Sequence, residues 1–131
     1  MSALINWLKT LFIGNAPEIN VNYCSAGVIT SGLKSVITKD IELILSNRKG
    51  KNYKFGKTGF APTRVDQYDY RAGTYDEMFL LYESTSKASV AELEGYYATK
   101  YHSRKGNDNI HKHSGGSMRS FDGYYYLYMV I

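Results

Sequence analysis

Apolar residues recur at helical spacing in three segments of the chain. Residues 1–16 leave one narrow polar side on a helical wheel, with Ser2 suited to cap the first turn and Gly14 suited to end the last. We therefore predict an N-terminal amphipathic helix that packs on the domain or on a second copy of the chain. Binding to a membrane surface is less favoured, because the polar side carries few basic residues.

The second helical segment covers residues 33–45, where leucine and isoleucine recur on one face. Ser35 or Thr38 is suited to cap its start. The third segment has capping-box spacing at Ser89–Glu92 and is predicted to run to about Tyr101. Each of these two segments therefore predicts a helix with one buried face.

Three short segments are predicted to be strands, namely residues 53–56, the continuous apolar run 78–82, and residues 124–131 with four tyrosines and a β-branched end. Pro62 favours a short helix after the first of them, and residues 106–117 form a polar loop. Helices and strands thus alternate along the chain, without an internal repeat. This order predicts a single domain over residues 1–131 with an α+β fold, in which a small sheet is flanked by helices.

Composition narrows the class of protein. With 131 residues, 44% of them hydrophobic, the chain can form one core and is too apolar to be disordered. Its single cysteine, Cys24, excludes an internal disulfide, and the paired cysteines of a structural zinc site are absent from the sequence. No apolar stretch approaches the roughly 20 residues of a spanning helix, and no signal-peptide pattern is found. We therefore expect an intracellular, cytoplasmic protein.

Positive charge is concentrated in two stretches. Residues 48–57 hold five lysines and arginines and no acid, a second basic stretch follows Lys100, and residues 66–94 between them carry seven acids. Such a distribution is typical of proteins that bind a nucleic-acid backbone, and a solvated loop face gives the same pattern. His111 and His113 are interpreted as part of a basic loop, with metal ligation as the less favoured alternative. The candidate nucleic-acid-binding residues are Lys49, Lys51, Lys54, Arg104 and Lys105.

Glu94 is the most informative position of the third helix. On a helical wheel it lies about 40° from Val90, on the same face as Tyr97 and Tyr101, whereas Glu92 points away. A carboxylate that faces a core is unfavourable unless an arginine, a hydrogen-bond cluster or a metal ion compensates it. Glu94 is therefore a candidate metal ligand. The alternative is a position at the rim of the buried face, from which the carboxylate reaches water.

Residues 53–59, with the sequence Tyr-Lys-Phe-Gly-Lys-Thr-Gly, are followed by Pro62 and Arg64. This segment resembles the second half of the signature of the GIY-YIG endonucleases, in which a strand runs into Lys-Thr and an arginine follows in a short helix. Glu94 in the third helix is similar to the glutamate of that family, and Asn109 before two glycines is similar to its asparagine loop. The resemblance covers roughly residues 52–131.

The resemblance implies a GIY-YIG-like core that hydrolyses phosphodiester bonds, typically in DNA, with one divalent metal ion. It implies that Glu94 holds Mg²⁺ or Mn²⁺ and that Arg64 contacts the scissile phosphate. Tyr53 would act as the base or position the water, while Lys57 would hold phosphate and lower the pKa of that tyrosine. Asn109 would orient Glu94 or the loop.

The first motif of the family, a Gly-Ile-Tyr strand shortly before the second, has no match at that place, and the nearest candidate is Val21–Tyr23. Two functions therefore stay open. One is a stand-alone metal-dependent endonuclease of a phage or mobile element. The other is a catalytically inactive module with the same fold that binds nucleic acid or a protein. In either case the N-terminal helix is the predicted surface for a homodimer or a partner.

Overall fold

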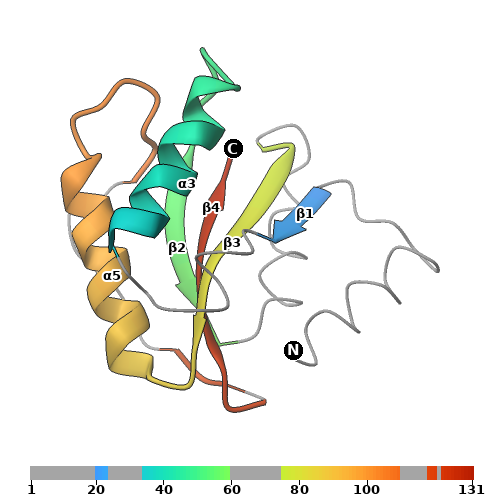
Figure 1. The fold of residues 1–131 in the computed structure, drawn as a ribbon, viewed down its shortest axis with the longest axis vertical. Coiled ribbons are helices and arrows are strands. Elements are labelled where there is room, and N and C mark those ends of the chain that lie inside the picture. Colours follow the sequence, from blue (N-terminus) through green and yellow to red (C-terminus); the bar gives the residue numbers. More distant parts are fainter. Residues whose placement is uncertain (1–19, 24–33, 60–74, 110–117, 121) are drawn as a thin grey trace.

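The computed structural model describes residues 20–23, 34–59, 75–109, 118–120 and 122–131 (Figure 1). Its elements are strand β1 (Asn20–Tyr23), helix α3 (Lys34–Ser46), strands β2 (Lys54–Thr58) and β3 (Glu77–Ser84), helix α5 (Lys87–Lys100) and strand β4 (Tyr125–Val130). The predicted α+β fold is confirmed. The helices expected at residues 1–16 and after Pro62, and most of the expected polar loop, lie outside the described residues.

The four strands form one sheet in the order β1-β3-β4-β2. β4 lies between β3 and β2 and is antiparallel to both, whereas β1 is parallel to β3 at the edge. The last strand of the chain is therefore central, and residues 126–131 are all buried. Their nearly continuous run of large apolar side chains is typical of a strand that is covered on both faces.

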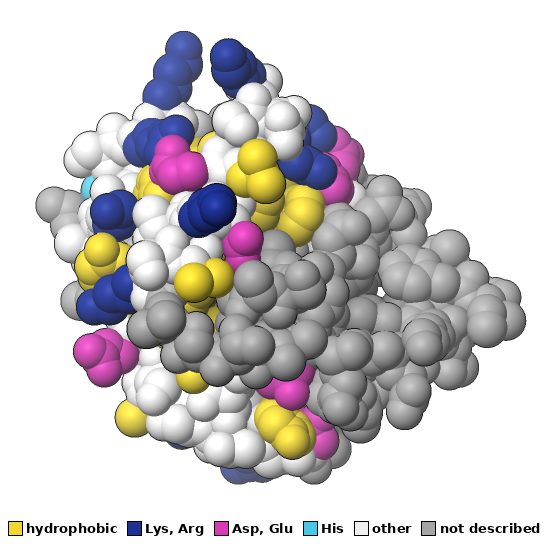
Figure 2. Space-filling model, in the orientation of Figure 1, with side chains coloured by type: hydrophobic (Ala, Val, Ile, Leu, Met, Phe, Trp, Pro, Cys, Tyr) yellow, Lys and Arg dark blue, Asp and Glu magenta, His cyan; other side chains and the backbone are white. Residues whose placement is uncertain are grey.

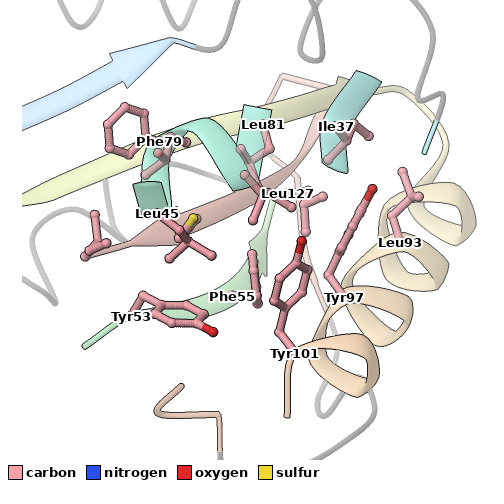
Figure 3. Close-up of a cluster of buried hydrophobic side chains, with 14 of the residues drawn as sticks. Ile37, Leu45, Tyr53, Phe55, Phe79, Leu81, Leu93, Tyr97, Tyr101 and Leu127 are labelled. Atoms are coloured by element: carbon pink, nitrogen blue, oxygen red, sulfur yellow. The ribbon is translucent and has the colours of Figure 1, made fainter. Parts of the chain in front are cut away.

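Both helices cover the same face of the sheet in Figure 1. Tyr97 and Tyr101 of α5 pack against Phe55 of β2, with ring centroids 6.0 and 5.4 Å from that of Phe55, and Figure 3 shows these rings between helix and strand. The Tyr97 hydroxyl also donates to the carbonyl oxygen of Lys34 at 3.0 Å and lies 2.9 Å from the Thr38 hydroxyl. Tyrosine thus supplies both the apolar area and the polar contacts that hold α3 on α5.

The helix starts differ from the sequence predictions. α5 begins after Ser86, whose Oγ accepts a hydrogen bond from the Ser89 backbone N–H at 3.2 Å, so the cap lies three residues before the predicted capping box. Ser35 and Thr38 lie inside α3 and do not cap it. The apolar period located the buried faces, whereas the several hydroxyl residues near each start made the exact cap ambiguous.

Candidate active site

Glu94 lies on the inner face of α5, as its place on the helical wheel predicts. Only 6% of its surface is exposed, and its neighbours Val90, Leu93 and Tyr97 belong to the hydrophobic core. Its ion-pair partner is Lys57 of β2, whose Nζ is 3.7 Å from Oε2 of Glu94, and each of the two side chains is 8% exposed. The fold therefore brings together two residues that are 37 positions apart in the sequence, at 57 and 94.

Oε2 of Glu94 is buried and receives no hydrogen bond from any residue that the structure describes. At 3.7 Å the contact with Lys57 is electrostatic and too long for a hydrogen bond. Buried carboxylate oxygens are normally satisfied, so this one retains unused capacity to accept a hydrogen bond or to ligate an ion. Mg²⁺ and Mn²⁺ prefer oxygen ligands, and Mg²⁺ is commonly held by one or two carboxylates together with water and substrate phosphate. The donor present fits such an ion, which Glu94 would hold.

Lys57 reaches Glu94 because of its place in β2. Side chains alternate along a strand, so Phe55 and Lys57 face α5, whereas Gly56 faces the opposite side. A Cβ at Gly56 would overlap the ring of Tyr128, its partner in β4, so the glycine leaves space for this ring on that face of the sheet. The Gly-Lys sequence thus places a small residue on one face and turns the lysine toward the helix on the other.

Tyr53 lies toward the opposite end of this strand. Four residues, or about 13 Å of extended chain, separate it from Lys57, and Phe55 lies between them. Its ring packs edge-to-face on Phe55 with centroids 5.8 Å apart, and only 1% of the residue is exposed (Figure 3). Burial raises the pKa of the Tyr53 hydroxyl above its usual value of 10.0, although the charge of Arg104 acts the other way. The structure therefore does not bring Tyr53 to Glu94 and Lys57, and Lys57 does not lower its pKa.

Asn109 fastens the loop after α5 to the outer edge of β2. Its Oδ1 accepts a hydrogen bond from the Phe55 backbone N–H, and its Nδ2 donates one to the Phe55 carbonyl oxygen, both at 2.9 Å. The Tyr53 N–H donates to the carbonyl oxygen of Gly106 at 2.8 Å, and the Asp108 N–H donates to that of Tyr53 at 2.7 Å. Of the two roles implied for Asn109, orienting the loop is the one that these contacts support.

The sequence pattern placed Tyr125 in a predicted strand and gave it no role in the candidate site. Lys57 pairs with Leu127 of β4, and Tyr125 precedes Leu127 by two residues. It therefore lies on the same face as Lys57 and diagonally across from it, within reach of a long side chain. Its ring is partly buried against the core cluster that includes Leu93 and Leu127. The pattern of residues 124–131 indicates a strand, but not that this strand lies beside β2.

The two basic stretches meet at one end of the sheet. Lys49 and Lys51 lie in the turn between α3 and β2, and the other stretch begins in the loop after α5 with Arg104 and Lys105. The backbone bonds between Tyr53 and that loop hold the two segments side by side. Figure 2 shows Lys and Arg side chains gathered at the upper end of the molecule, where Figure 1 has the turn after α3.

The predicted nucleic-acid-binding residues differ in exposure and in whether they form ion pairs. Lys51 pairs with Asp76, and Arg104 pairs with Glu42 at 2.6 Å. Lys49 and Lys105 are exposed, and neither forms an ion pair with a residue in the described ranges. Lys54 is half-buried in β2 and, three positions before Lys57, points to the other face of the sheet.

Arg64, His111 and His113 lie outside the described residues. Among the residues that are described, no three or more histidine, cysteine or acidic side chains gather as a metal-binding group, so Glu94 is a single carboxylate. No helix in this part of the chain has both the length and the apolar composition needed to cross a membrane. No protein-family model, curated protein or solved structure matches the chain.

Proposed function

We propose that this protein is a metal-dependent endonuclease that hydrolyses phosphodiester bonds in nucleic acid, with DNA as the preferred substrate. The observation that carries the proposal is a buried Glu94 oxygen that lies beside the Lys57 ammonium and receives no hydrogen bond from the residues that the structure describes. Burying a carboxylate with so little compensation disfavours folding, and a bound ion is one way in which such an oxygen is satisfied. The resemblance of residues 53–64 and of the Glu94 helix to the GIY-YIG endonucleases supports the same reaction.

Each residue has a role that follows from the charge of the reaction. Water attacks phosphorus and an alcohol leaves, so negative charge builds on the phosphoryl oxygens. Glu94 would hold a divalent cation, which when bound would stabilise that charge and lower the pKa of water. Lys57 contacts the same phosphate as a point charge, and Arg64 is proposed to bind it through two parallel hydrogen bonds.

We assign the phenol that positions the attacking water to Tyr125 rather than to Tyr53. Tyr125 shares a face with Lys57, whereas the Tyr53 ring is enclosed about 13 Å away along β2. A tyrosine in β4 needs no strand immediately before β2. The assignment therefore accounts for the absence of the Gly-Ile-Tyr motif at its expected place in the sequence.

The basic end of the sheet supports a polymeric substrate. Lys51 and Lys57 are six residues apart, which corresponds to about 20 Å of extended chain. A duplex advances about 3.4 Å per base pair, so roughly six base pairs span this distance. Backbone phosphates that contact Lys51 and Lys57 would therefore lie about six base pairs apart. A mononucleotide would be too short to use both.

Nicking of supercoiled plasmid in Mg²⁺ or Mn²⁺ tests the proposal. We expect the unmodified protein to produce open-circular DNA and Glu94→Gln to reduce the rate by about 100-fold or more, the scale seen when one group that stabilises a transition state is removed. Glu92→Gln is the matched control, because Glu92 lies on the exposed side of the same helix. An equal effect of the two substitutions, or nicking that survives Glu94→Gln, would reject Glu94 as the metal ligand.

The exposed Lys49 and Lys105 favour one second candidate, a module that binds nucleic acid without cutting it. Its signature would be retention of duplex DNA that weakens steeply with salt while the plasmid stays supercoiled in either metal. Replacing both lysines by alanine should then weaken binding and reduce its salt dependence. This outcome would replace the endonuclease by the binding module.

A further inference from the structure

The Lys57 ammonium lies beside the Glu94 oxygen that would ligate a metal ion. Its Nζ is 3.7 Å from Oε2, both side chains are 8% exposed, and no described residue donates a hydrogen bond to that oxygen. Lys57 is thus the positive charge that compensates Glu94 when the site holds no other cation.

A divalent cation on Glu94 and the Lys57 ammonium in its present position would repel each other. A Mg²⁺ ion lies about 2.1 Å from a ligating oxygen, so any ion on Oε2 would be within about 6 Å of Nζ in its present position. Two positive centres that close, in a site shielded from water, repel each other strongly. An incoming metal ion therefore favours movement of the ammonium away from Glu94, and a new anionic partner would stabilise the ammonium there.

The phosphate of the substrate is the anion that fits. Lys57 has a flexible four-carbon stem and an ammonium that binds phosphate as a point charge, without the fixed geometry that arginine requires. A phosphodiester arriving at the site offers Lys57 a negative charge and releases Glu94. The same phosphate supplies oxygen ligands for the metal ion, which one carboxylate alone does not provide.

We propose that Lys57 and the divalent cation are alternative partners of Glu94, and that the backbone phosphate exchanges one for the other, so that metal and nucleic acid bind cooperatively. This inference rests on the proposed function for the identity of the anion. Without nucleic acid, Lys57 competes with the metal and the affinity for metal is low. With nucleic acid bound, the competition ends, and by reciprocity the metal raises the affinity for nucleic acid by the same factor.

The experiment measures Mn²⁺ binding to the full-length protein by the loss of the electron paramagnetic resonance signal of free Mn²⁺, which is independent of cleavage. In the absence of DNA we expect Lys57→Met to bind Mn²⁺ about tenfold more tightly than the unmodified protein, and Lys57→Arg to bind like the unmodified protein. Glu94→Gln should lose this binding. Unchanged or weaker Mn²⁺ binding by Lys57→Met would overturn the exchange and make the pair purely structural.

The second arm adds a short duplex with a phosphorothioate backbone, with the duplex alone as the blank. The unmodified protein should gain at least about fivefold in Mn²⁺ affinity, the lower end of typical coupling, and Lys57→Met should gain less. The measurement on the unmodified protein needs no variant, so it tests the exchange even if Lys57→Met fails to fold. No gain in the unmodified protein would overturn the proposal.

The two proposals fail in different ways. A protein that nicks plasmid but shows no competition between Lys57 and Mn²⁺ keeps the endonuclease and loses the exchange. A protein that never nicks but shows the gain with duplex keeps the exchange and loses the hydrolytic reaction. The plasmid and resonance measurements therefore separate them.

Discussion

The Lys57–Glu94 pair makes a sharp prediction about stability. Both side chains are 8% exposed, so removing one partner leaves a charge in the core that water cannot reach. We expect Lys57→Met to lower the free energy of unfolding by about 3 kcal/mol, the lower end of the range for broken buried pairs, because the 3.7 Å contact is not a hydrogen bond. Glu94→Met should have a similar effect, because it isolates the ammonium.

The double variant separates the pair from its parts. Replacing both residues by methionine removes both charges and keeps similar volume, so the free energy of unfolding should return to within about 1 kcal/mol of that of the unmodified protein. The coupling free energy would then be about 5 kcal/mol, larger than the usual range of about 0.5–3 kcal/mol for neighbouring residues, because each single variant buries an isolated charge.

Urea unfolding followed by circular dichroism, at neutral pH and without divalent metal, gives the four free energies. For 131 residues the entropy of unfolding is about 0.28 kcal/mol per kelvin, so a loss of 3 kcal/mol should also lower Tm by about 11 °C. Lys49→Met and Glu92→Met are matched controls, because both residues are exposed and should change stability by less than about 0.5 kcal/mol. Additive effects of the two core substitutions would refute the claim that each charge is compensated by the other.

Three further predictions follow from the contacts described above. Tyr125→Phe should slow plasmid nicking by about 100-fold while Tyr53→Phe leaves the rate within about threefold, and the reverse order would return the phenol to Tyr53. Asn109→Ala should lower the free energy of unfolding by about 2 kcal/mol, since it removes two hydrogen bonds to Phe55, and faster hydrogen exchange of the Phe55 amide should report the loss; unchanged exchange would show that the loop is held otherwise. Burial raises the pKa of the hydroxyls of Tyr53, Tyr97 and Tyr101 in the folded state, so stability should fall above about pH 10. An unfolded tyrosine ionises first, so the stabilisation is complete below pH 10 and is lost as the pH rises. Urea unfolding at pH 9 and pH 11 would detect the loss.

Local periodicity was sufficient to predict α3 and α5 and their buried faces. Isoleucine at positions 37, 41 and 44 follows the helical period, and all three are buried in α3. The same argument placed Glu94 among apolar neighbours, where the structure has it. This works because the angle between side chains on a helix depends only on their separation in the sequence.

Local sequence patterns did not predict which residue caps each helix or where Tyr53 lies relative to Lys57. Several hydroxyl residues suit the start of each helix, and packing selects one of them, as it does with Ser86. Tyr53 and Lys57 lie on the same strand face, but a strand is extended, so four residues place them too far apart to share one site. A separation of only four residues therefore does not place Tyr53 and Lys57 in one site.

The sequence by itself predicted α3 and α5, the apolar face of each, and the place of Glu94 on the apolar face of α5. Those properties follow from periodicity and from the free energy of transferring each side chain out of water. Only the tertiary structure decided which groups meet: β4 from the end of the chain lies beside β2, Lys57 lies against Glu94, and Tyr125 lies across from Lys57. Strand order depends on contacts between residues far apart in the chain, and no local pattern specifies which partners those contacts join.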